Sequence, residues 1–186
     1  MIEFSADKVK LAETVMRGSP EKITKMFSQV VNRVADGVKT DAIRKTRESY
    51  NIKATSARGQ VQIKKGSAGN IGAIIRAQGP TIPLSKFKVT PARPTPGRTK
   101  PVYAQVKKGG GGELKKAFVI RAQNGHIGVM SRVGTARLPL RQHYGPSVPQ
   151  MLGNQEVTQH IEQQAQERMD KRFEHEINRY LRGINI

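Results

Sequence analysis

Apolar residues recur at steps of three and four from Ile23 to Val38. That is the spacing of one face of an α-helix. Ser19-Pro20-Glu21 comes just before them and has the features of a helix start: a cap residue, a proline at the first helical position and an acid in the first turn. We therefore predict a long helix over residues 19–49. Gly37 inside it costs about 1 kcal/mol relative to alanine, so we expect a bend or a close contact there.

A second helical series lies near the end of the chain, where apolar positions follow at steps of four from Val157 to Leu181. Asn154 can cap this helix and Gly183 can end it, which predicts a helix over residues 154–183. Such a helix has about 28 residues and is on the order of 42 Å long. Because a domain of this size needs less to close its core, we expect one end to pack on the chain's own sheet and the other on another subunit.

The remaining segments read mainly as strands. Residues 1–18 are expected to form a short strand over 1–5 and then a short helix. From residue 50 to residue 136 the pattern alternates between apolar and polar positions, which is typical of β-structure. Strands are expected at residues 61–63 and 70–77, paired as a hairpin, at residues 102–107 and 114–121, paired as another, and at residues 127–133.

Residues 137–153 are dense in proline and glycine yet carry apolar side chains, so they are not a polar linker. Prolines fix their own φ and push the preceding residue to an extended conformation. A regular helix is therefore not expected to run through this segment, and a central strand would lose ladder hydrogen bonds. Two interpretations stay open: a rigid connector inside one domain, or a docking segment for a partner.

These elements predict an α+β fold, with long N-terminal and C-terminal helices packed on a mostly antiparallel β-sheet with extended basic loops. With 186 residues, one domain over residues 1–186 is expected. Aromatic residues are only 5% of the chain and tryptophan is absent, so the core is expected to be modest and aliphatic. That composition suits a protein that gains stability in an assembly.

The net charge of +19 is concentrated in the middle of the chain. Residues 1–50 carry +3, residues 51–150 carry +17 with Glu113 as the one acid, and residues 151–186 carry −1. Such a field favours a polyanion or an acidic protein surface as a neighbour. The proline-rich residues 88–101 are expected to form an extended, mobile basic loop. The candidate basic contacts are Lys86, Lys88, Arg93, Arg98, Lys100, Lys107, Lys108, Lys115 and Lys116.

Little in the sequence favours catalysis. There are no cysteines, and the four histidines do not follow a metal-binding pattern. Ser147 lacks the strand–turn–helix context of a hydrolase nucleophile. The glycines at 109–112 lack the Lys-Ser/Thr of a phosphate loop and fit a hairpin tip better. We expect no enzyme activity, no metal, no cofactor and no membrane segment, since no apolar run approaches about 20 residues.

Several short segments occur in a fixed order between about residue 20 and residue 182. They are residues 47–52, 82–87, 117–118, 125–132, 137–140, 144–151 and 172–177. In this order they resemble the minor tail protein Z, or tail-completion, family of long-tailed bacteriophages. The resemblance implies a virion structural protein, assembled in the host cytoplasm, that forms a ring of six copies at the head-proximal end of the tail. Its implied neighbours are the tail tube or tail terminator and the head–tail connector, with non-specific contact to DNA in the channel.

Composition and pattern, not the family, select the residues expected at the subunit interface. They are apolar positions of the proline-rich segment and of the last helix: Leu138, Leu140, Tyr144, Val148, Met151, Phe173, Ile177 and Leu181. A competing class is a free basic nucleic-acid-binding protein. Stacking aromatics are few, however, with Tyr50, Phe87, Tyr103 and Phe118 forming no recognisable platform. A nuclease is a distant third, because an acid-poor region cannot easily hold a divalent metal.

Overall fold

The structure, a computed structural model, describes residues 2–67, 69–97 and 100–183. The chain divides into two compact units, each assembled from separate segments. Unit 1 comprises Met1–Ala42, Val61–Arg76 and Gln155–Ile186, and unit 2 comprises Ile43–Gln60 and Ala77–Asn154. The chain therefore passes from one unit to the other four times. The expectation that it folds as one domain stays a prediction.

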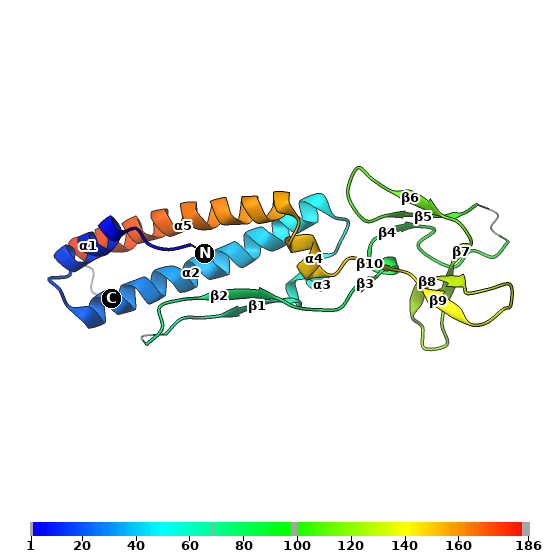
Figure 1. The fold of residues 1–186 in the computed structure, drawn as a ribbon, viewed down its shortest axis with the longest axis horizontal. Coiled ribbons are helices and arrows are strands. Elements are labelled where there is room, and N and C mark those ends of the chain that lie inside the picture. Colours follow the sequence, from blue (N-terminus) through cyan, green and yellow to red (C-terminus); the bar gives the residue numbers. More distant parts are fainter. Residues whose placement is uncertain (1, 68, 98–99, 184–186) are drawn as a thin grey trace. The chain divides into compact units, whose positions relative to one another are not determined.

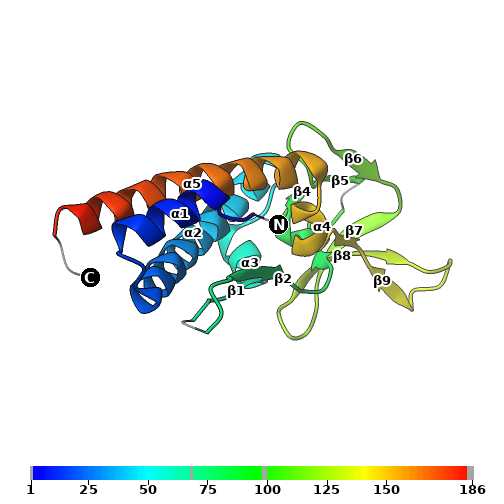
Figure 2. The same cartoon turned by 60° about the vertical axis from the view of Figure 1, so that its left-hand side comes forward.

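Three helices form the body of unit 1: α1 (Ala6–Val15), α2 (Pro20–Ser49), which continues past Ala42 into unit 2, and α5 (Gln155–Leu181). They lie side by side in both views (Figure 1, Figure 2). Both predicted long helices are confirmed, with ends within one or two residues of the expected ones. Gly183 has φ +72°, which suits a residue after a helix end. The strand expected at residues 1–5 is not formed by residues 2–5.

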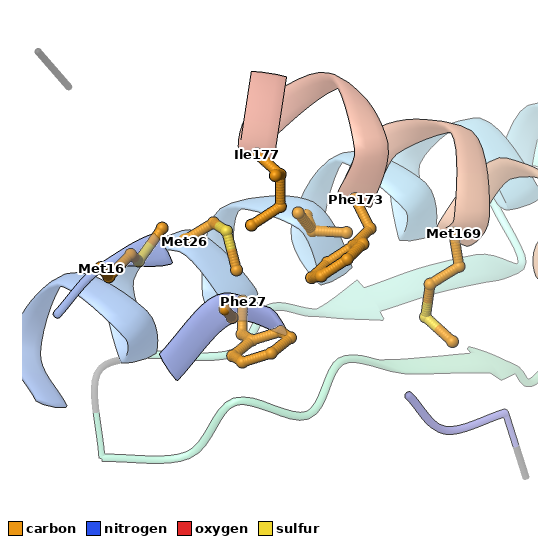
Figure 3. Packing of buried hydrophobic residues seen from close by; sticks show 8 residues of the cluster. Met16, Met26, Phe27, Met169, Phe173 and Ile177 are labelled. Atoms are coloured by element: carbon orange, nitrogen blue, oxygen red, sulfur yellow. The ribbon is translucent and has the colours of Figure 1, made fainter. Parts of the chain in front are cut away.

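The core of unit 1 is where the three helices meet. The rings of Phe27 of α2 and Phe173 of α5 stack with their centroids 6.0 Å apart. The ring centroid of Phe4 lies 4.5 Å from that of Phe27. Figure 3 shows these two helices directing their side chains into one cluster. The fully or nearly fully buried members are Ala12, Met16, Met26, Phe27, Val30, Met169, Phe173 and Ile177. Three methionines fill the space around the few rings, a use that their flexible side chains suit.

Charged groups also join the helices of unit 1. Asp41, only 1% exposed, accepts a hydrogen bond from Arg168 Nε at 2.5 Å. Gly37, one turn earlier, leaves room for that arginine, because a Cβ there would lie 3.1 Å from Arg168 Nη1. The close contact predicted at Gly37 is therefore confirmed. Glu176 is fully buried within α5 and is paired with Arg172 and Arg179.

A two-stranded sheet of β1 (Val61–Lys64) and β2 (Ile74–Ala77) completes unit 1, as the predicted hairpin required. Polar side chains of α2 hold its loop. Asn32 Nδ2 donates to Gly66 O at 3.0 Å while Gly66 N donates to Asn32 Oδ1 at 2.8 Å. Ser28 Oγ donates to Ser67 O at 3.1 Å, and Lys65 pairs with Asp36 at 2.8 Å. Because Ser28, Asn32 and Asp36 follow one another at steps of four, one helix face makes all four contacts.

Unit 2 holds three small sheets. The strands of the two larger sheets are β4 (Lys88–Thr90), β5 (Val102–Gln105), β6 (Gly112–Leu114), and β7 (Ala117–Arg121), β8 (Ile127–Arg132), β9 (Leu140–Gln142). Neighbours in both are antiparallel. The third pairs β3 (Ile82–Pro83) with β10 (Tyr144–Gly145). The hairpin predicted between residues 102–107 and 114–121 is wrong in its second half: Lys116 has φ +63°, which ends one strand and lets β7 pair with β8 instead.

Three short helices were not predicted: α3 (Ala54–Arg58), the 3-10 turn η1 (Leu84–Lys86) and α4 (Val148–Leu152). The last corrects the expectation that residues 137–153 contain no helix. Ser147 caps α4 in a capping box with Gln150, and Pro149 sits in the first turn, where no backbone N–H is needed. Proline thus permits a helix that begins just before it, although none can run through it.

The predicted α+β class is confirmed: terminal helices are combined with antiparallel sheets. In the described ranges the strands are divided among four small sheets rather than one. The main core described here lies between helices, so the N-terminal and C-terminal helices pack chiefly on each other in unit 1.

Candidate functional site

The excess positive charge coincides with unit 2. That unit contains 18 Lys/Arg and two acids, for a net +16, whereas unit 1 contains 15 Lys/Arg and 12 acids, for a net +3. The separation of charge in the fold is therefore nearly the same as along the sequence, where residues 51–150 carry +17. Because opposite charges in unit 1 largely cancel, an anionic partner would be attracted chiefly to unit 2.

The β4–β5–β6 sheet arranges the candidate basic contacts at its two ends. Lys88 pairs in register with Gln105, so Lys86 and Lys88 lie at the end from which Lys107 and Lys108 follow β5. At the opposite end, Val102 pairs with Leu114. That end therefore carries Arg93, Lys100, Lys115 and Lys116. At about 3.3 Å per residue along β5, the two groups are on the order of 10 Å apart.

All the described candidates are exposed, and Arg98 lies outside the described residues. Lys107 extends over the ring of Tyr50, with Nζ 5.8 Å from the centroid. Residues 88–101 were expected to be one extended loop, but their first three residues form β4. Of the rest, the described residues 91–97 and 100–101 lie outside helices and strands.

Aromatic side chains offer no platform for stacking bases. Tyr50 and Phe87 are buried, Phe118 is half-buried, and Tyr103 alone of the four is well exposed, at 42%. The glycine-rich tip lies against that ring, because a Cβ on Gly111 would fall 2.4 Å from the Tyr103 hydroxyl. The arrangement therefore suits contact with the backbone charge of a polyanion, or with a carboxylate-rich surface, rather than reading of bases.

The predicted interface residues divide by burial. Leu138 and Leu181 are 67% and 64% exposed, Tyr144 is 53% exposed, and Leu140 is half-buried. Val148, Met151, Phe173 and Ile177 are at most 5% exposed and pack inside the subunit. The exposed and half-buried residues are therefore accessible to a partner, whereas the four buried residues are not.

Groups with titratable or nucleophilic chemistry do not converge. Ser147 is occupied as a helix cap, and no group of three or more His, Asp or Glu in the described ranges could hold a metal ion. Among the described titratable groups, His143 alone has a clearly shifted pKa: burial first and the nearby Arg141 second lower it below its ordinary value of 6.5. Its Nε2 is buried and has no hydrogen-bond partner. His143 therefore contributes to the pH dependence of stability.

The sequence-based reasoning missed two sets of residues. It did not single out the acids buried in unit 1, Asp41 and Glu176, because a charged residue on a helical pattern normally signals solvent. It also missed the exposed apolar residues Ile71, Ile74 and Ile75. The signal for these was present: two consecutive isoleucines in a short strand break the alternation that buries one face only.

No described helix has the length and apolar character that crossing a membrane requires. No curated protein and no solved structure matches the chain. A family model does match, described as prophage minor tail protein Z (GPZ), and the match runs from residue 14 to residue 185. This match confirms the resemblance seen in the sequence, and it implies a structural component of a phage tail and hence of the virion. With nearly its whole length matched, the chain belongs to the prophage minor tail protein Z family.

Proposed function

We propose that this minor tail protein is a ring subunit at the head-proximal end of the tail, where it completes the tail and makes it competent to join the head. In this role the chain forms a homo-oligomer, with six copies to match a sixfold tail. The tail tube or tail terminator lies on one side of the ring and the head–tail connector on the other. The family match supports the tail role, and the position at the neck is our inference.

The separation of charge between the two units carries this proposal. A subunit whose cations lie almost wholly in one unit can present that unit to an anionic neighbour and keep the other for contacts of a different kind. Two anionic neighbours fit a neck: an acidic surface of an adjoining ring, and the DNA in the channel. Exposed cations on short strands and loops would contact either one through charge alone.

Subunit association would use the exposed apolar positions rather than the buried ones. Leu138, Tyr144 and Leu181 are the most exposed of the predicted interface residues. Apolar contact supplies affinity, whereas the basic sheet ends supply attraction and orientation.

The test is restoration of head–tail joining in an extract of phage that lacks this protein. Purified wild-type chain is expected to restore infectious particles. Lys108→Glu with Lys115→Glu, one change at each sheet end, is expected to reduce the yield at least tenfold at low salt. The difference from wild type should shrink as salt is raised, because salt screens the charges. Lys10→Glu with Lys25→Glu makes the same change in net charge at exposed positions of unit 1 and is the matched control. Equal yields from both double variants would contradict a role for the basic sheet ends.

The same charge favours a second candidate, a free nucleic-acid-binding protein. Light scattering with and without duplex DNA separates the two. A monomer or dimer that binds duplex tightly, and whose duplex-binding variants leave head–tail joining intact, would favour the second candidate. A ring-sized species without DNA would favour the first.

A further inference from the structure

Unit 1 has a groove of about 690 Å³ that its own core leaves open. Its walls include Val34 and Val38 of α2, Ile161 and Met169 of α5, and Ile74 and Ile75 of β2, and the N-terminal residues 2–4 also line it. All the lining residues belong to unit 1, so the groove lies within one compact body. β2 is an edge strand, since its sheet has only two strands. Exposed strand edges with apolar side chains are sites at which other chains dock.

The lining of this groove is unusually exposed for apolar residues. Ile74 is 52% exposed, and Ile2, Ile71 and Ile75 are 36–37% exposed. These are four of the ten large apolar side chains that are strongly exposed in the described part of the chain, and all four face one groove. A contiguous apolar surface of this kind marks an interaction site. The charged residues in the lining are both acids, Glu3 and Glu162.

Unit 2 carries a surface with the complementary properties. Every residue from 132 to 139, in the connection between β8 and β9, is exposed. Leu138 and Val133 are 67% and 66% exposed, the highest values among large apolar side chains in the described residues. Arg132 and Arg137 lie beside them in the chain. A hydrogen bond from Val133 N to Pro139 O, at 3.2 Å, closes the base of this loop.

We propose that the loop of residues 132–139 of one copy docks in the unit 1 groove of a second copy. Val133 and Leu138 enter the groove, and Arg132 and Arg137 pair with Glu3 and Glu162. Charge selects this occupant: an apolar insert flanked by cations fits an apolar groove flanked by acids better than an acidic or neutral partner would. The proposal deepens the proposed ring, on which it rests.

In this proposal the loop and the groove of each copy contact two different neighbours, which makes the contact heterologous rather than reciprocal. Each subunit gives its loop to one neighbour and receives a loop from the other. Repeated heterologous contacts close into a ring when the rotation between neighbours permits it. The proposal thus identifies the contact that would make the chain a ring subunit rather than a symmetric dimer.

The experiment uses two variants of the full-length chain. The loop variant, Val133→Ser with Leu138→Ser, keeps the groove, and the groove variant, Ile74→Lys with Glu162→Lys, keeps the loop. All four positions are exposed, so the variants are expected to fold, which circular dichroism verifies. Light scattering should show a large oligomer for wild type and monomers for each variant alone. An equal mixture should give a dimer and nothing larger, because one intact loop–groove pair remains.

Leu11→Ser is the control, because this side chain is 47% exposed but neither lines the groove nor belongs to the expected subunit interface. It should assemble like wild type. Since the chain has no cysteine, a second measurement is available. Leu138→Cys and Ile74→Cys chains, mixed and oxidised, should form a disulfide-linked heterodimer in preference to either homodimer.

Three results would overturn the proposal: variants that assemble like wild type, a mixture that stays monomeric, or a wild-type chain that stays monomeric at millimolar concentration. A monomeric wild type that nevertheless restores head–tail joining in extract would remove the loop–groove contact and leave the proposed function standing. Oligomers that form as expected but fail to restore joining would do the opposite.

Discussion

Asn32 uses both ends of its side-chain amide to hold the backbone of Gly66, accepting from its N–H at 2.8 Å and donating to its carbonyl at 3.0 Å. Gly66 has no space for a side chain, because a Cβ there would lie 2.8 Å from the carbonyl oxygens of Asn70 and Gly72. The pair attaches the β1–β2 loop to α2. The position of β2, one wall of the unit 1 groove, therefore depends on this amide and its glycine together with the Ser28–Ser67 and Lys65–Asp36 contacts.

Asn32→Ala is expected to destabilise the chain by about 1–3 kcal/mol, since a typical net hydrogen bond contributes about 0.5–1.5 kcal/mol and two are lost. Asn32→Asp keeps the acceptor for Gly66 N–H but faces the Gly66 carbonyl with a carboxylate, so it should also destabilise. Urea unfolding followed by circular dichroism measures both. Thr40→Ala, which removes one exposed hydrogen bond within α2, is the control and should change little. Equal effects of Asn32→Ala and Thr40→Ala would show that the loop is held by other contacts.

Phe173→Ala should cost about 3–5 kcal/mol, because the ring is 1% exposed and contacts Phe4 and Phe27 in the core. Leu181→Ala on the same helix should stay within about 0.5 kcal/mol, since Leu181 is 64% exposed. Differential scanning calorimetry at one protein concentration provides the comparison. A loss at Leu181 as large as the loss at Phe173 would mean that Leu181 is buried in an assembly.

Glu176→Gln is expected to destabilise the chain by about 1–3 kcal/mol, because the buried carboxylate accepts from Arg172 and also lies 3.5 Å from Arg179. Both arginines are partly exposed and can turn toward water, which limits the loss. Glu174→Gln, two residues away and exposed, removes the same charge from the same helix. The difference between the two variants in guanidinium unfolding gives the contribution of the buried group. No difference would show that Glu176 is not held as an ion pair.

Stability is expected to fall on mild acidification, in part through His143. Its pKa is lowered in the folded state by burial and by Arg141, so the unfolded chain binds more protons just below pH 6.5. Where the unfolded state binds more protons, stability rises with pH. The contribution of His143 is therefore complete above pH 6.5 and is lost as pH falls from there toward the lowered pKa. His143→Gln should make the free energy of unfolding less dependent on pH between 7.5 and 5.5. Unchanged pH dependence would mean that His143 titrates normally.

Local patterns predicted the helices well because each signal lies within the helix itself. Ser19-Pro20-Glu21, the apolar series after it and Gly183 mark starts, faces and ends that need no tertiary context. Strand pairing depends on single conformations instead. The positive φ of Lys116 ends one strand, so β7 pairs with β8 instead of with β5. A lysine does not favour a positive φ, so the sequence could not predict this conformation. Similarly, Pro149 was expected to prevent a helix, but the capping box of Ser147 and Gln150 places it in the first turn of α4.

The candidate site was predictable in its charge and not in its apolar part. Lysine and arginine stay at the surface almost wherever they occur, so the described basic candidates are exposed as expected. The exposure of an apolar residue cannot be predicted from its type in the same way. Met151 and Leu138 belong to the same proline-rich segment, yet one is fully buried and the other is 67% exposed. Only the packing of α4 separates them, and that packing depends on residues distant in sequence.

The interleaving of the two units has a consequence for the order in which the chain matures on the ribosome. Unit 2 ends at Asn154, so all its segments have been synthesised before α5 begins. The core of unit 1, by contrast, needs Met169, Phe173 and Ile177, which are made after every segment of unit 2. The apolar face of α2 therefore lacks its α5 partner until α5 has been synthesised. A nascent chain without α5 accordingly lacks a finished groove and cannot receive a neighbour's loop.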